Sequence, residues 1–421
     1  MRWLHRLLVV GLLSLTGWLS LLGATAFAEG EQLVGTLQTG TSGPIEGVTV
    51  TVETAAGDEV GSVQTDEDGR FAIELDGPGD YVVRLDPDDL PDTVILREGG
   101  DVREYTVGLG RTQPVIFGIG DGSVGQGGGN NVFLQRAVEG IRFGLLIAMA
   151  AVGLSLIFGT TGLVNFAHGE LVAIGAIIAW FVNISGGIPL IPATLIAIAA
   201  GALVGALTDL GLWRPLRSRG TGLVAMLVIS IGFSLTLRYV LQIVYGGSAR
   251  PYADYRGQRA TSYGPVSLTD KDIYSIVISV VVLVLVGLML QRTKIGKAMR
   301  AVSDNQDLSA SSGINVDRVI LFVWMVGGGL ATLGGVLFGL SDEVSWDMGF
   351  RLLLLMFAGI VLGGLGTAYG ALLGSLIVGI FVQLSTLVIP DETKYIGGLL
   401  LLIIILVVRP SGILGSRVRV G

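Results

Sequence analysis

Hydrophobic and polar residues follow one pattern in the first quarter of the chain and another in the rest. Between residues 32 and 108, apolar positions alternate with polar ones, and clusters of Gly, Pro and Asp separate the alternating runs. This period of two is typical of half-buried strands joined by short turns. It predicts a small antiparallel β-sandwich over residues 29–113, with inward-facing side chains at Val48, Val50, Val52, Phe71, Ile73, Leu75, Tyr81, Val83 and Leu85.

Long apolar runs fill most of the remaining chain. A helix needs about 20 apolar residues to cross the hydrocarbon layer, and candidate runs occur at 140–159, 163–182, 191–212, 223–245, 273–290, 319–340, 352–367, 370–389 and 395–408. Two runs are short, and the glycines at 363–366 suit a re-entrant turn as well as a full crossing. The predicted fold class is therefore mixed: a β-sandwich, a glycine-rich linker at 114–135, an all-α polytopic membrane bundle of eight to ten helices over 136–410, and a cytoplasmic tail at 411–421.

The first 28 residues have the pattern of an export signal. Arg2, His5 and Arg6 precede an apolar stretch, and Ala26-Phe27-Ala28 fits the small-residue pattern of a cleavage site. We predict a signal peptide over 1–28, with an uncleaved first membrane helix as the alternative. Either one delivers the β-domain to the outer face of the membrane.

Charge divides the chain at the same place as the hydrophobic pattern. Residues 29–112 hold 19 Asp/Glu and 5 Arg, whereas residues 113–421 hold 15 Asp/Glu and 20 Lys/Arg. Nine crossings that start outside would place eleven basic residues in cytoplasmic segments and six in outer loops, in keeping with the positive-inside bias. This predicts a multi-pass protein of the bacterial plasma (inner) membrane with an extracytoplasmic β-domain and a cytoplasmic C-terminus. The acidic β-domain argues against nucleic-acid binding.

Composition excludes several kinds of chemistry. Charged residues make up 14% of the chain, well below the ~25% of soluble domains, which argues against a wholly soluble enzyme. The chain has no cysteine and two histidines, so thiol catalysis, iron–sulfur clusters and multi-histidine metal sites are excluded. Asp66, Glu67 and Asp68 are either calcium ligands or a solvated acidic turn. We predict the turn, and no metal site.

Glycines recur at a spacing that suits helix packing. Small residues four positions apart let membrane helices approach closely where lipid gives no hydrophobic drive. We predict that tight packing, rather than a direct role with substrate, explains Gly335, Gly339, Gly366, Gly370 and Gly374.

Three polar residues, Asn165, His168 and Glu170, lie between two apolar runs. Polar groups at membrane depth are costly, so they either satisfy one another or line a wet path. On a helix, Asn165 and Gly169 would share a face. The three residues are candidates for a translocation path, with structural hydrogen bonding as the alternative. No nucleophile lies near them in sequence, and no catalytic residue is predicted.

A polar, basic segment separates two apolar runs at residues 291–318. A loop of this length and composition predicts one or two short helices beneath the membrane. Seated in a groove of another protein, such a helix would transmit force. Gly296-Lys297 is not part of a phosphate-binding loop, because position 291 is Gln and position 298 is Ala. The chain is therefore not expected to bind ATP by that motif.

Five segments in this order resemble the permease subunit of branched-chain amino acid ABC importers: 165–170, Arg214-Pro215-Leu216-Arg217, the 291–318 loop, the glycine run at 358–370, and Arg409-Pro410-Ser411-Gly412. The resemblance implies a non-enzymatic membrane subunit that binds no cofactor itself. It implies a second permease, identical or paralogous, cytoplasmic ATPases that use ATP, and an extracytoplasmic solute-binding protein. It also implies docking on the ATPase through Lys297, Arg300, Ala301, Gly313, Ile314 and Asn315.

The β-domain resembles the carboxypeptidase regulatory-like sandwich of many exported proteins, on the turn Thr65-Asp66-Glu67-Asp68-Gly69-Arg70-Phe71 and two similar Gly-led segments. Other functions stay open for the membrane part. One is a urea, amide or sugar permease of the same machinery. Another is a proton-coupled secondary transporter in which His168 and Glu170 relay protons. A third is a receptor or adhesion module that acts through the β-domain.

Overall fold

The computed structural model describes residues 31–39, 43–91, 94–96, 101–107, 112–115, 117, 119–121, 129–255, 258, 260–389, 393–408 and 412–413. The predicted signal peptide and most of the predicted tail lie outside the described residues. The chain divides into two compact units, Met1–Gly127 and Gly128–Gly421. Each unit is described by itself.

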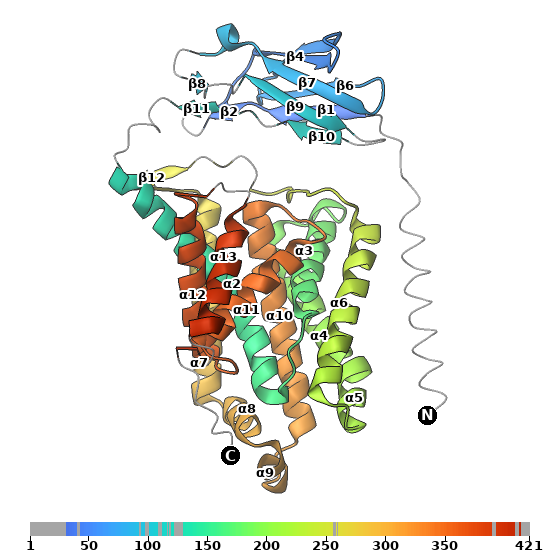
Figure 1. Cartoon of the computed structure of the whole chain (residues 1–421), viewed down its shortest axis with the longest axis vertical. Helices are drawn as coiled ribbons and strands as arrows, with labels where there is room; N and C mark the ends of the chain where they lie inside the picture. Colours follow the sequence, from blue (N-terminus) through green and yellow to red (C-terminus); the bar gives the residue numbers. More distant parts are fainter. Residues whose placement is uncertain are drawn as a thin grey trace. The chain divides into compact units, whose positions relative to one another are not determined.

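The first unit is built from two β-sheets around one apolar core (Figure 1). One sheet has the order β5(Glu59–Gln64), β4(Thr49–Thr54), β7(Gly79–Leu85) and β9(Val102–Val107), all antiparallel. The other has the order β10(Thr112–Val115), β1(Gln32–Thr36) and β6(Arg70–Glu74). Short pairs join β2(Gln38–Thr39) to β3(Gly43–Pro44), and β8(Val94–Leu96) to β11(Ile119–Asp121).

The alternating pattern places side chains in this unit as predicted. The nine apolar residues expected to point inward are all buried. One detail differs from a purely antiparallel sandwich, because β1 pairs with β10 in parallel. Strand β10 lies at the sheet edge and contains Pro114, which lacks a backbone N–H and is tolerated there.

The acidic turn at 66–70 is held by hydrogen bonds from its backbone to the Asp66 side chain. One Asp66 carboxylate oxygen, Oδ1, accepts N–H bonds from Asp68 at 3.0 Å and from Arg70 at 2.7 Å. Gly69 supplies the positive φ of 71° that closes the turn. Among the described residues, no group of three His, Cys, Asp or Glu side chains is arranged to hold a metal ion.

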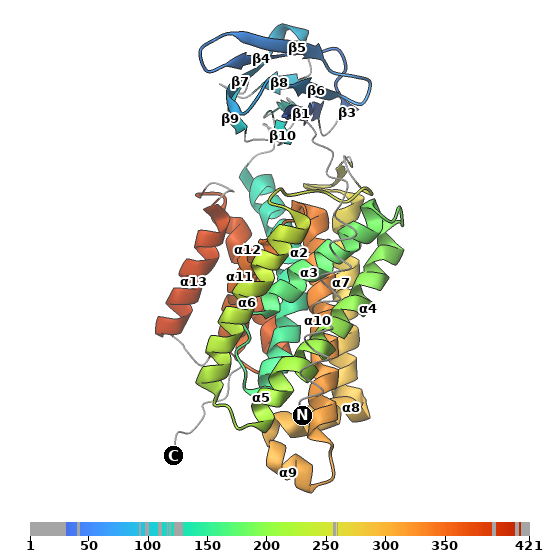
Figure 2. The same cartoon turned by 90° about the vertical axis from the view of Figure 1, so that its right-hand side faces the viewer.

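The second unit is a bundle of long helices that run up and down past one another (Figures 1 and 2). Six helices are long and apolar enough to span a membrane, and three shorter apolar ones accompany them, counted over the described residues. This total agrees with the predicted eight to ten. The helices are α2(Gly129–Thr161), α3(His168–Ile184), α4(Leu190–Thr208), α6(Leu223–Tyr245), α7(Asp270–Arg292), α10(Val316–Asp342), α11(Met348–Gly363), α12(Ala368–Ser385) and α13(Lys394–Val408).

Helix α2 begins earlier than the apolar pattern indicates. Residues 129–135, which composition assigns to the linker, are its first turns. The Gln135 side chain exchanges hydrogen bonds with the backbone of Ser267 at 2.9 and 3.0 Å. Ser267 lies in a hairpin of β12(Thr261–Tyr263) and β13(Val266–Leu268) that was not predicted. These contacts tie the start of the helix to the rest of the bundle.

Glycines let the central helices touch backbone to backbone. A Cβ atom added at Gly335 would lie 2.2 Å from the Val172 carbonyl oxygen, and one at Gly374 would lie 2.0 Å from the Gly359 carbonyl oxygen. Gly370 lies similarly close to the Gly363 carbonyl oxygen, whereas Gly339 faces the side chains of Val344 and Tyr252. Gly366 has a φ of 81° and forms a turn.

The glycine run at 363–366 ends one helix and turns the chain into the next. Helix α11 ends at Gly363, and α12 starts at Ala368 and packs along it. Gly364 has a φ of 109°, a conformation that favours glycine. The N–H of Ile413 donates to the Leu362 carbonyl at 2.7 Å, so the closing segment satisfies a carbonyl at the end of α11.

Short helices gather at one end of the bundle (Figures 1 and 2). They are α5(Arg214–Ser218), α8(Lys294–Asp304) and α9(Gln306–Ser311), and a π-helical turn, Asp209–Trp213, leads from α4 into α5. The 291–318 loop therefore folds into two short helices, as its composition predicts.

Candidate functional site

The candidate path residues lie where the chain passes from α2 to α3. Gly162, with a φ of 69°, ends α2, and α3 does not begin until His168. The expectation that Asn165 and Gly169 share a helix face is wrong, because Asn165 precedes the helix. Its carboxamide oxygen accepts the Ala167 N–H at 3.1 Å. An Asn side chain that bonds its neighbouring backbone competes in this way with helix formation.

His168 is fully buried at the start of α3 and faces α2. Its Nε2 lies 3.0 Å from the carbonyl oxygen of Ala150. Because a carbonyl only accepts, Nε2 carries the proton. Its Nδ1 has no hydrogen-bond partner within the described part of the chain.

Glu170 is fully buried two residues further along α3 and is paired with α6. Its Oε1 accepts a hydrogen bond from Ser234 Oγ at 3.0 Å and from Arg238 Nε and Nη2 at 3.3 and 3.2 Å. Ser230, a turn earlier on α6, accepts the Phe166 N–H at 3.1 Å. Sequence reasoning missed this partner helix, although the spacing of Ser230, Ser234 and Arg238 in an otherwise apolar run marks one polar face.

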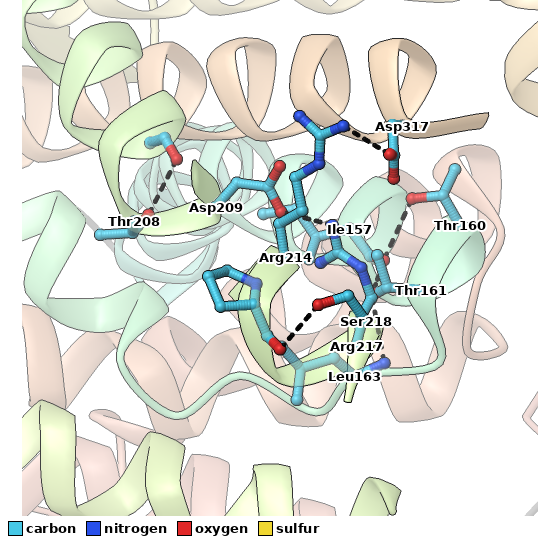
Figure 3. Close-up of polar contacts among 12 residues, drawn as sticks. Ile157, Thr160, Thr161, Leu163, Thr208, Asp209, Arg214, Arg217, Ser218 and Asp317 are labelled. Carbon is cyan, nitrogen blue, oxygen red and sulfur yellow. Dashed lines mark hydrogen bonds and ion pairs between the residues drawn. The ribbon is translucent and has the colours of Figure 1, made fainter. Parts of the chain in front are cut away.

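A second polar cluster connects α4, α5 and α10 (Figure 3). Asp209 is fully buried and accepts a hydrogen bond from Arg217 Nη2 at 2.7 Å. Arg214 donates to Asp317, in the first turn of α10, at 2.5 Å. Beside them the Trp213 ring stacks on that of Trp324. The Arg-Pro-Leu-Arg turn is thereby fixed to the helix that leaves the 291–318 loop.

Side-chain caps define each helix start in the 291–318 loop. Thr293 caps α8, Asn305 caps α9, and Asn315 caps α10 through a 3.0 Å bond from the Arg318 N–H. Gly313 has a φ of 86°, which lets the chain turn into α10.

The predicted coupling residues lie mainly on the outside of this loop. Lys297 and Arg300 are exposed on α8, while Ala301 and Ile314 are half-buried. Leu308 on α9, which sequence reasoning did not select, exposes 65% of its surface.

A cavity of about 760 Å³ adjoins α8. Its lining includes Gly159 and Thr160 from the end of α2, Met299 and Ser303 from α8, and Gly366 and Tyr369 beside the α11–α12 turn. Gln306 also donates to the Thr160 carbonyl at 2.5 Å. Helices α8 and α9 are therefore in direct reach of the end of α2, and the chain runs from there through residues 162–167 to the buried polar residues of α3.

Comparisons with known proteins agree with this arrangement. Residues 32–112 match the carboxypeptidase regulatory-like domain, and residues 136–408 match the family described as branched-chain amino acid transport system / permease component. No solved structure matches the chain.

The match to three amino acid permeases extends over almost the whole length of those proteins. The high-affinity branched-chain amino acid transport system permease protein LivH of Escherichia coli is 30% identical over 297 residues, 67% of this chain and 96% of that protein. The corresponding protein BraD of Pseudomonas aeruginosa is 29% identical with the same coverage. A probable LivH of Methanocaldococcus jannaschii is 30% identical over 68% of this chain and 93% of its own length. With its membrane helices in the same stretch, the chain belongs to the family of permease components of branched-chain amino acid transport systems.

Proposed function

We propose that this protein is a membrane subunit of an ATP-driven importer that takes up branched-chain amino acids. In this proposal it acts with a second permease, identical or paralogous, with cytoplasmic ATPase subunits and with an extracytoplasmic solute-binding protein. The subunit itself binds no cofactor and catalyses no reaction. The N-terminal β-domain and the solute-binding protein are on the outer side, and the C-terminus is in the cytoplasm of a bacterial cell.

The exposed surface of α8 and α9 is the main support for docking on an ATPase subunit. Lys297 and Arg300 are exposed there, and Leu308 presents an apolar side chain at the same end of the bundle. A surface that combines basic side chains with an exposed leucine has the polar and apolar parts of a protein interface. Ala301, Gly313, Ile314 and Asn315 set the shape of this surface. Movement of α8 would reach the end of α2 through the cavity that Met299 and Ser303 of α8 line.

Asn165, His168 and Glu170 are proposed to stand beside the translocation path. The binding protein and ATP each favour one access state, and only such differential affinity shifts the equilibrium. We expect Glu170→Leu to lower uptake more than His168→Ala does. The first change leaves the Arg238 guanidinium without its carboxylate, which costs more than the loss of one neutral hydrogen bond. Equal, near-normal uptake in both variants would assign these residues to structure alone.

The identity of the substrate rests on the relatives. The ribose import permease RbsC of Escherichia coli is 28% identical over 55% of this chain and 72% of its own length. A nucleoside permease, NupB of Lactococcus lactis, matches only 26% of this chain. The amino acid permeases match more of both chains, which favours an amino acid over a sugar.

Two experiments test the proposal. A Leu308→Cys variant of this cysteine-free chain should form a cross-link to a co-expressed ATPase subunit, whereas a cysteine at Val240, on α6, should not. Co-purification of an ATPase and a second permease is expected from native membranes. Purification of the chain alone, with no cross-link at Leu308, would contradict the assignment.

A further inference from the structure

Arg238 is a charged residue on α6, the least buried of the six long apolar helices. It lies seven residues before the end of α6 at Tyr245, about 10 Å at 1.5 Å per residue. Only 17% of the apolar stretch of α6 is buried, and its neighbour Val240 is 46% exposed. A charge that faced lipid here would be strongly disfavoured. The Arg238 side chain nevertheless keeps 13% of its surface exposed, which leaves part of it open to water or to a polar ligand.

The pairing of Arg238 with Glu170 is one-sided. All three hydrogen bonds to the carboxylate, two from Arg238 and one from Ser234, end on Oε1. The other oxygen, Oε2, is buried and accepts no hydrogen bond from any described group. Arginine and carboxylate usually meet as two parallel bonds, one to each oxygen. Here an anionic oxygen is left without a donor, which is costly in an apolar interior.

Aromatic side chains border the pair. The Arg238 guanidinium lies 3.8 Å above the ring centre of Phe350, which is 38% exposed. Phe357, two turns along α11, packs on Phe166 with ring centres 5.0 Å apart. The charged pair therefore adjoins apolar surface that an aliphatic side chain could contact.

We infer that Arg238 and Glu170 recognise the two charged groups of an amino acid as it passes. The α-carboxylate binds the Arg238 guanidinium, and the α-ammonium donates to the free Oε2 of Glu170. The inference rests on the proposed function and adds to it the residues that select for a zwitterion. A sugar has neither charge, and an amine or a keto acid has only one.

The natural absence of cysteine provides a clean test. A Phe350→Cys variant is reconstituted in vesicles with its ATPases, second permease and binding protein. Its reaction with the membrane-impermeant 2-sulfonatoethyl methanethiosulfonate is timed alone and with leucine, leucinamide or 4-methyl-2-oxopentanoate. A Val240→Cys variant, similarly exposed but on the opposite side of α6, is the matched control.

We expect Phe350→Cys to react and leucine to protect it. Leucinamide and the keto acid, each lacking one charge-assisted contact, should protect about tenfold more weakly. Adding Arg238→Gln should abolish the advantage of leucine over leucinamide. Arg238→Lys retains the positive charge but not the forked guanidinium, and it should reduce that advantage. This variant takes the place of Arg238→Gln if the latter fails to insert into the membrane.

The inference would be overturned if all three compounds protected Phe350→Cys equally, or if leucine did not protect it. The same pattern of protection at Val240→Cys would also overturn it. Leucine uptake by the same vesicles separates the two claims. Persistent uptake with any of these results refutes the zwitterion pair and leaves the proposed function intact. ATP-dependent uptake of a sugar instead of leucine would refute the proposed function itself.

Discussion

The close contact between α11 and α12 at Gly374 determines how strongly an added methyl group there should destabilise the bundle. A Cβ atom at this position would lie 2.0 Å from the Gly359 carbonyl oxygen and 2.7 Å from the Gly363 backbone nitrogen. Both are backbone atoms, so no rotamer change relieves the clash. Since ordinary contacts begin at 3.4 Å, Gly374→Ala must move the two helices apart by about 1.4 Å, or bend one of them.

The expected destabilisation is the overpacking cost less the gain in helix propensity. Overpacking by one methyl group costs about 1–3 kcal/mol, and Gly→Ala in a helix returns roughly 0.5–1 kcal/mol. The net loss is about 0–2.5 kcal/mol, with a central value of ~1.2 kcal/mol, or a factor of about 8 in the folding equilibrium. Gly232→Ala is the matched control, because a Cβ there would have no atom within 4 Å. It should be neutral or slightly stabilising.

The free energy of unfolding is measured on purified protein in mixed micelles of increasing SDS content, with tryptophan fluorescence as the signal. Gly374→Ala should unfold at a lower SDS fraction than the natural protein, and Gly232→Ala should not. If both variants unfold with the natural protein, the backbone approach between α11 and α12 is not as tight as described.

Three further changes test other parts of the structure. Arg217→Ala leaves the buried Asp209 carboxylate unpaired and should destabilise the bundle by about 3–5 kcal/mol; adding Asp209→Asn should recover much of this in the same SDS titration, and no recovery would contradict the pairing. Gly313→Glu, at a φ of 86°, should keep ATPase activity and membrane insertion but lose uptake; normal uptake would remove this turn from coupling. Hydrogen bonds from Thr49 lower the pKa of Asp89 in the β-domain. Its contribution to stability is therefore present above the pKa of the unfolded chain and is lost as pH falls through the folded value. Hydrogen exchange at the Thr49 amide, corrected for intrinsic rates, should lose protection over that acid range, and an Asp89→Asn variant should show no such pH dependence.

The elements that could be predicted from sequence are those fixed by local periodicity. Val48, Val50 and Val52 alternate because one face of their sheet is buried, and the pattern carries that information without any knowledge of the partner strand. Apolar runs such as 319–340 predict helices because the bilayer sets the length of a crossing. The two short helices of the 291–318 loop follow from its polar composition between such runs.

The parts that could not be predicted depend on which elements pack together. Arg238 was missed because its partner, Glu170, lies 68 positions away and only the fold brings them together. The helical face expected for Asn165 fails because its side chain bonds the Ala167 backbone instead. The parallel pairing of β1 with β10 likewise depends on a contact between distant strands. Periodicity reports which face of an element is buried, but not what covers it.

Reconstitution of the purified chain in vesicles tests most directly whether it depends on a separate motor. With ATPases, a second permease, the binding protein and ATP, we predict leucine accumulation that stops when ATP is omitted. The chain alone, under an imposed pH gradient, should accumulate no leucine. Accumulation by the chain alone under that gradient would contradict the account and identify a proton-driven transporter.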